Sequence, residues 1–240
     1  QFRLTWKTIG ITAATLLAVD LLFILIHFFT TLPEGHTLAS FASAEILDIS
    51  VPSTLPGVYL SLKLLFGSAI AAFVTCTFDP EERIPSFWYL AIIVLGYLAI
   101  NEMTDFESIW AENIAVRLFG THIGQNRGNL LSQGIPMAAF YISAIVELRA
   151  RYKQALYILL ASSIILTVGS LWPDITIPIH NLILQTVLSP FIDPIAQETF
   201  QTIWRDGLTL INYTLVITGL AVALHGMQKK IVTYSGRYDK

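Results

Sequence analysis

The sequence contains a single cysteine, Cys76, among its 240 residues. One thiol can form neither an internal disulfide nor a metal or iron–sulfur site that needs several thiolates. Cys76 lies between Thr75 and Thr77 in an apolar run, so we expect it to be buried as a small hydrophobic side chain. The cysteine content therefore excludes a disulfide-stabilised scaffold and every cluster held by several cysteines.

Charged residues are also scarce. They make up only 13% of the chain, whereas 54% of the residues are apolar. A soluble domain has about 25% charged and about 45–50% apolar residues. This composition excludes a soluble globular enzyme, a disordered chain and a nucleic-acid-binding protein. The chain also has no P-loop, GxSxG, HExxH or paired-cysteine motif, so no catalytic class is indicated.

Long apolar runs are what the sequence does have. A transmembrane helix needs about 20 predominantly apolar residues, and six windows meet this requirement: 8–30, 58–78, 84–103, 129–147, 154–172 and 207–228. The fourth window is the weakest, and Pro136 is expected to kink it. We predict an all-α integral membrane protein, with one domain over 1–240 that forms a bundle of about six transmembrane helices. Short interfacial helices are expected in the long connections 31–57, 104–128 and 173–206.

The placement of Lys and Arg predicts the orientation. If the amino terminus is inside, the inner segments hold ten basic residues and the outer segments hold three. The inner residues are Arg3, Lys7, Arg83, Arg149, Arg151, Lys153, Lys229, Lys230, Arg237 and Lys240, and the outer ones are Arg117, Arg127 and Arg205. Because short loops rich in Lys and Arg stay in the cytoplasm, we predict a multi-pass protein with both termini cytoplasmic.

Four Asp, Glu, Lys or His residues lie within the first three predicted spans: Asp20, His27, Lys63 and Glu102. Each is costly in a bilayer unless it has a partner or a function. All four fall in the outer half of their spans, so a polar cluster is possible there. In one interpretation the carboxylates and the histidine bind a cation, a metal or a proton in transit. In the other, Asp20 and Lys63 form a buried pair that fixes the packing of the first two helices, while Glu102 reaches the interface.

A second candidate set lies at the outer ends of the spans and in the outer loops. Its members are Glu102, Glu107, Asp174, His180 and Asp206. They would form a cation or metal site if at least three of them converged with oriented ligand atoms; otherwise they are solvated or hydrogen-bonded. His27 and His225 could each singly ligate a haem or chlorin, but their predicted positions in opposite leaflets exclude joint ligation. No cofactor is predicted, and bound lipids are expected.

Several short segments occur in a recognisable order. They are Leu47-Asp48-Ile49-Ser50 followed by Leu55-Pro56, Asn101-Glu102 to Glu107, Asp174 to His180, and Asp206-Gly207. In this order the chain resembles a widespread group of uncharacterised bacterial polytopic inner-membrane proteins. The resemblance implies six helices and a bacterial inner membrane, but no activity. That group typically has two aspartates and a His-Glu pair after the third span, whereas this chain has Glu107-Ser108 and lacks the histidine.

The absence of catalytic motifs and the departure from the group's acidic pattern favour a non-catalytic role. We predict an accessory subunit packed laterally against a larger bacterial membrane complex, with an energy-transducing complex as a plausible host. The expected partners are the lipid bilayer and other membrane-protein subunits, and no nucleic acid. The alternatives are an intramembrane metal-dependent enzyme or cation-binding protein, and a small transporter with Asp20 and Lys63 on its path.

The predicted orientation can be tested with introduced cysteines in a chain whose own Cys76 is replaced by alanine. A membrane-impermeant thiol reagent added to intact cells should modify the Ser40→Cys variant, because position 40 is predicted to lie outside. The Ser235→Cys variant should react only after the membrane is permeabilised. The reverse labelling pattern would contradict the orientation.

Overall fold

A computed structural model describes residues 4–31, 49, 54–77, 85–104, 117, 133–171 and 203–238. Within these ranges every regular element is helical, which confirms the all-α fold class. The α-helices are α1 (Trp6–Thr31), α2 (Leu55–Thr77), α3 (Ser86–Thr104), α6 (Ile135–Leu148), α7 (Lys153–Leu166) and α10 (Leu208–Tyr238). The π-helical segment η4 (Thr167–Leu171) extends α7, and η6 (Ile203–Gly207) leads into α10.

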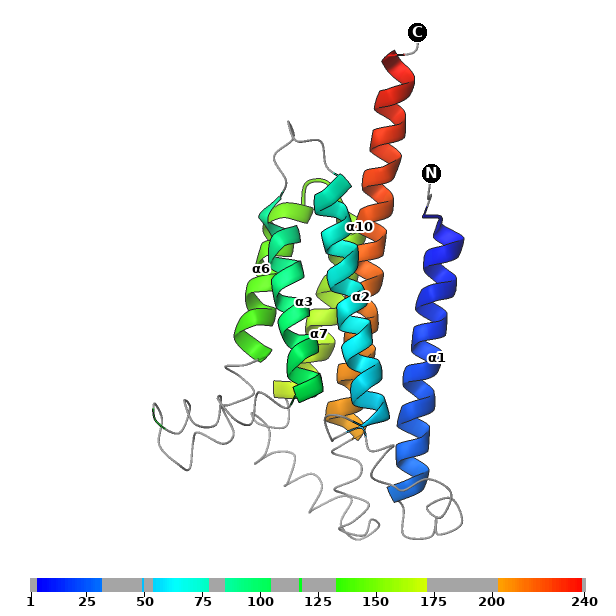
Figure 1. Cartoon of the computed structure of the whole chain (residues 1–240), viewed down its shortest axis with the longest axis vertical. Coiled ribbons are helices and arrows are strands. Elements are labelled where there is room, and N and C mark those ends of the chain that lie inside the picture. Colours follow the sequence, from blue (N-terminus) through cyan, green and yellow to red (C-terminus); the bar gives the residue numbers. More distant parts are fainter. Residues whose placement is uncertain are drawn as a thin grey trace.

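The helices stand side by side as one bundle, with α1 at its edge (Figure 1). The beginning of α1 and the end of α10 lie at the same end of the bundle (Figure 1). Among the described residues, four helices are long and apolar enough to cross a membrane: Trp6–Phe29, Leu55–Cys76, Ser86–Thr104 and Trp204–Gln228. The chain is therefore a membrane protein. The other two predicted spans correspond to shorter apolar helices, Ile135–Leu148 and Lys153–Gly169.

Two single residues lie in other surroundings than the sequence suggests. Pro136 lies in the first turn of α6, directly after the π-helical residues 133–134, where a proline is better tolerated than in the middle of a span. Cys76 is exposed on the surface of the bundle rather than buried. The buried positions of α2, which include Leu64, Ala71 and Val74, recur every three or four residues, and Cys76 lies off that stripe.

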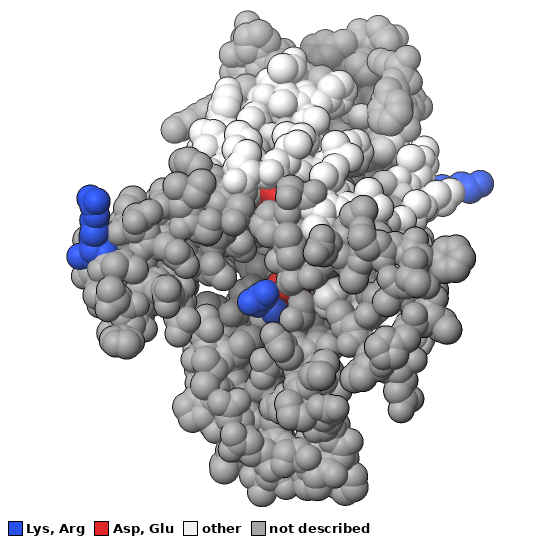
Figure 2. Space-filling model, turned by 60° about the horizontal axis from the view of Figure 1, so that its bottom comes forward, with Lys and Arg blue, Asp and Glu red and all other residues white. Residues whose placement is uncertain are grey.

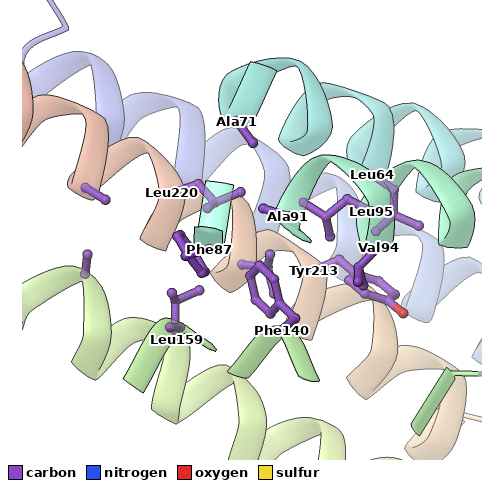
Figure 3. Packing of buried hydrophobic residues seen from close by; sticks show 14 of the residues in the cluster. Leu64, Ala71, Phe87, Ala91, Val94, Leu95, Phe140, Leu159, Tyr213 and Leu220 are labelled. Carbon is purple, nitrogen blue, oxygen red and sulfur yellow. The ribbon is translucent and has the colours of Figure 1, made fainter. Parts of the chain in front are cut away.

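Large apolar side chains fill the centre of the bundle. Phe87 of α3, Phe140 of α6 and Leu159 of α7 are fully buried, and Figure 3 shows them pointing toward one another beside Leu220 of α10. The Phe87 and Phe140 ring centroids are 5.3 Å apart with the rings tilted, an arrangement favoured by aromatic quadrupoles. The core therefore joins α3, α6, α7 and α10 at one point.

Helix α10 is the most enclosed of the long helices, and α1 is the least. In the most apolar stretch of α10, 72% of the residues are buried, whereas in that of α1 only 17% are. The close packing of α10 on α7 requires a glycine, because a Cβ on Gly219 would lie 2.7 Å from Leu159 Cδ2. Small residues of this kind allow membrane helices to approach closely.

The glycine requirement predicts a difference between two alanine substitutions. Gly219→Ala should lower the free energy of unfolding by about 1–3 kcal/mol, because the added methyl group forces Leu159 or α7 to move. Gly10→Ala is the matched control, since nothing lies within 4 Å of a Cβ at that position. Thermal unfolding in detergent measures both variants. Equal stability of the two would show that the α7–α10 contact can relax without cost.

Candidate functional site

Asp20 of α1 and Lys63 of α2 form a buried ion pair. Lys63 Nζ lies 2.7 Å from Asp20 Oδ1, and both side chains are almost completely inaccessible, at 2% and 0% exposure. The pairing interpretation of these two residues is therefore confirmed. Because an unpaired charge in a bilayer is costly, each residue supplies the counter-charge that the other needs at this position.

Both groups are also bound by α10. The hydroxyl of Thr214 donates a hydrogen bond of 2.6 Å to Asp20 Oδ2, and Lys63 Nζ donates one of 2.8 Å to the backbone carbonyl of Leu210. The ammonium also lies 4.9 Å from the centroid of the Tyr59 ring, within the range of a cation–π contact. The Asp20–Lys63 site, formed by Asp20, Tyr59, Lys63, Leu210 and Thr214, thus joins three helices and has a partner for each carboxylate oxygen.

The sequence of α1 places Asp20 on the inward side of that helix. The buried residues Asp20, Phe23 and His27 are spaced by three and four positions, so they lie on one helical face. One turn earlier, the carbonyl of Leu16 accepts a hydrogen bond of 3.1 Å from the hydroxyl of Tyr59. The Phe23 and Tyr59 rings also meet, with centroids 5.3 Å apart.

Helices α1 and α2 are joined mainly by these long side chains. The backbone of α1 packs on α10 and η6, whereas α2 packs on α3 and α10. Tyr59 and Lys63 therefore extend from α2 across to α1. A lysine and a tyrosine have the length that this bridge requires, and their apolar stems remain in apolar surroundings.

The other two members of the predicted cluster are not among the groups described above that hydrogen-bond to the pair. His27 is buried farther along the inward face of α1, and Glu102 is half-buried near the end of α3. Asp20 and Lys63 bind each other. Asp20 also binds Thr214, and Lys63 also binds the Leu210 carbonyl. The structure therefore brings together two of the four predicted residues and recruits α10 instead.

The outer acidic set is only partly described. Glu107, Asp174 and His180 lie outside the described residues. Asp206 forms an ion pair with its neighbour, at 2.7 Å from Arg205 Nε. The described part of the chain contains no group of three or more His, Cys, Asp or Glu side chains able to hold a metal ion. Figure 2 shows the molecule with the bottom of Figure 1 turned forward. The described Lys, Arg, Asp and Glu residues that are visible there are few and scattered.

His225 is held at the opposite end of the bundle from His27. Its Nδ1 lies 2.7 Å from the carbonyl oxygen of Leu4, and because a carbonyl only accepts, Nδ1 is the donor. The Leu4 N–H donates to Gln228 Oε1 at 3.0 Å, and Trp6 contacts the imidazole edge to face. His225 and Gln228 thus attach the start of α1 to α10.

A second buried network has no charged member. The hydroxyls of Tyr141 and Ser162 are 2.7 Å apart, so one donates to the other. Both lie within hydrogen-bond distance of Asn212 Oδ1, Tyr141 at 3.2 Å, and this oxygen accepts the remaining hydrogen. This Tyr141–Ser162–Asn212 network joins α6, α7 and α10. Sequence reasoning missed it because neutral polar residues are tolerated in spans and demand no counter-charge.

Sequence reasoning also missed a contact between α6 and α3. Glu147 accepts hydrogen bonds from the Ser86 hydroxyl and, at 3.0 Å, from the Phe87 N–H. A carboxylate at the first turn of a helix satisfies free N–H groups and interacts favourably with the helix dipole. The position of Glu147 at the end of the fourth predicted span was the available signal.

Comparisons with known proteins add no relative. No protein-family model matches the chain, and neither the curated proteins nor the solved structures gave a significant match.

The Asp20–Lys63 pair predicts non-additive stability changes. Asp20→Asn or Lys63→Met alone should lower the free energy of unfolding by about 3–5 kcal/mol, because each leaves a buried charge without its partner. The double variant should recover part of this loss, since neither charge remains. Thermal unfolding of the four chains in detergent completes the double-mutant cycle. Losses that simply add would show that the two residues do not interact.

Proposed function

We propose that this chain is a non-catalytic accessory subunit that packs laterally against a larger complex in the bacterial inner membrane, with both termini in the cytoplasm. The observation that carries the proposal is the complete use of the Asp20–Lys63 site within the chain. Both carboxylate oxygens have a donor, and the ammonium has a carboxylate, a carbonyl and an aromatic ring as partners. Such an arrangement fixes the helices in place and leaves neither the Asp20 carboxylate nor the Lys63 ammonium free to act on a substrate.

The remaining buried hydrogen bonds support the same role. The Tyr141–Ser162–Asn212 network joins α6, α7 and α10, and Glu147 joins α6 to α3. In a bilayer, interhelical hydrogen bonds and close packing replace the hydrophobic effect as the forces that hold helices together. These buried polar side chains therefore serve a defined helix arrangement, which is what a structural subunit requires.

The outward surface suits lateral packing in the membrane. Exposed apolar residues occur on several helices, among them Leu22 on α1, Ile93 on α3 and Ile142 on α6. In a single chain these residues contact lipid tails. In a complex, one helical face would contact a neighbouring subunit while the others stay in contact with lipid.

A small transporter is the second candidate. The observation that favours it is the position of an ionisable pair near the middle of α1, because intramembrane ionisable residues commonly mark ion or substrate pathways. The complete set of partners around the pair favours the structural role over this alternative.

Site-specific photo-crosslinking in native membranes tests the subunit proposal. A photoreactive residue is placed in turn at Leu22, Ile93 and Ile142, which face outward on three different helices. A subunit in a complex should give one discrete crosslinked product from one helical face, and the same neighbour should co-purify stoichiometrically in mild detergent. The two non-contacting positions serve as matched controls. A chain that purifies alone and gives no protein crosslink from any face would contradict the proposal.

A further inference from the structure

The Asp20–Lys63 site has the ligand chemistry of a monovalent-cation site. Around the Lys63 nitrogen stand a carboxylate oxygen of Asp20 at 2.7 Å and the carbonyl oxygen of Leu210 at 2.8 Å. The same nitrogen lies over the Tyr59 ring, 4.9 Å from its centroid. Carboxylates, backbone carbonyls and aromatic faces are the groups that replace the water shell of a desolvated cation.

The single negative charge of Asp20 also requires one positive charge for a neutral site. Asp20 is fully buried, and its second oxygen accepts a hydrogen bond from Thr214. The ammonium of Lys63 supplies the single positive charge that balances this carboxylate. A divalent metal in the same place would leave one uncompensated positive charge, which is costly in a bilayer.

We infer that these oxygens form a site for a monovalent inorganic cation, which the chain fills with its own Lys63 ammonium. An ammonium nitrogen and a potassium ion accept oxygen neighbours at similar distances, so K⁺ is the best match and Na⁺ the smaller competitor. The site should therefore take up K⁺ or Na⁺ when the lysine side chain is shortened and its ammonium removed. This inference does not depend on the proposed subunit role.

The test is the salt dependence of thermal unfolding in the full-length chain. Lys63→Ala removes the ammonium and leaves space beside Asp20. Its Tm should rise by about 3 °C or more in KCl or NaCl relative to choline chloride at equal ionic strength, since a ligand that binds only the folded state stabilises it. The wild-type chain should show no such difference, because its ammonium already occupies the site.

Two further variants separate cation binding from general salt effects. Lys63→Met removes the charge but keeps side-chain volume in the space, so its Tm should not respond to the choice of cation. The double variant Asp20→Asn, Lys63→Ala keeps the space but lacks the carboxylate charge, and it should not respond either. A Tm of Lys63→Ala that is the same in K⁺, Na⁺ and choline would overturn the inference.

Failure of the key variant to fold is also informative. K⁺ or Na⁺ is abundant on both sides of the membrane, so a site that accepts either ion should allow Lys63→Ala to accumulate in membranes to a higher level than Lys63→Met. If Lys63→Ala does not accumulate while Lys63→Met does, no cation replaces the ammonium, and the inference is wrong.

Discussion

The buried pair of Asp20 and Lys63 is the interaction on which the position of α1 depends. Helix α1 exposes most of its surface and is apolar on all sides, and lipid tails are as apolar as its leucines. Apolar contact alone therefore specifies neither its rotation nor its depth. Only one placement brings Asp20 to both Lys63 and Thr214 while the Leu16 carbonyl meets the Tyr59 hydroxyl. Polar contacts thus select the docked position of a helix that hydrophobic burial leaves undetermined.

Helix α10 connects this pair to the rest of the bundle. Leu210 and Thr214 are four residues apart and share one face, whereas Asn212, two residues along, points to the opposite face at 3.6 residues per turn. One face binds Asp20 and Lys63, and the other binds Tyr141 and Ser162. Two polar networks at the same level therefore fix the rotation of α10, and a shift of the helix toward either network would loosen the other.

The sequence predicted the parts of this arrangement that involve long apolar runs or unpaired charge. The length of the apolar runs predicts a helical membrane protein. The need for a counter-charge in a bilayer favours a pair between Asp20 and Lys63. Leu210 was not predictable, because it acts through a backbone carbonyl that every residue possesses. Ser162 and Asn212 are neutral, so nothing in the pattern demanded a partner for them. The surroundings of Pro136 depend on where α6 begins, and the exposure of Cys76 depends on which face of α2 turns inward. A uniformly apolar sequence predicts neither.

The completeness of the Asp20–Lys63 site also restricts how the bundle can move. Any motion that takes α1 away from α2 and α10 removes Asp20 from the Lys63 ammonium and from the Thr214 hydroxyl at once. Two opposite charges would then stand apart in a medium that solvates neither. Such a motion can occur without a large energetic cost only if Asp20 receives a cation or a proton while Lys63 loses its proton or finds another anion. The helices therefore either stay together, as a structural subunit requires, or separate through an exchange that leaves the total charge at the site unchanged.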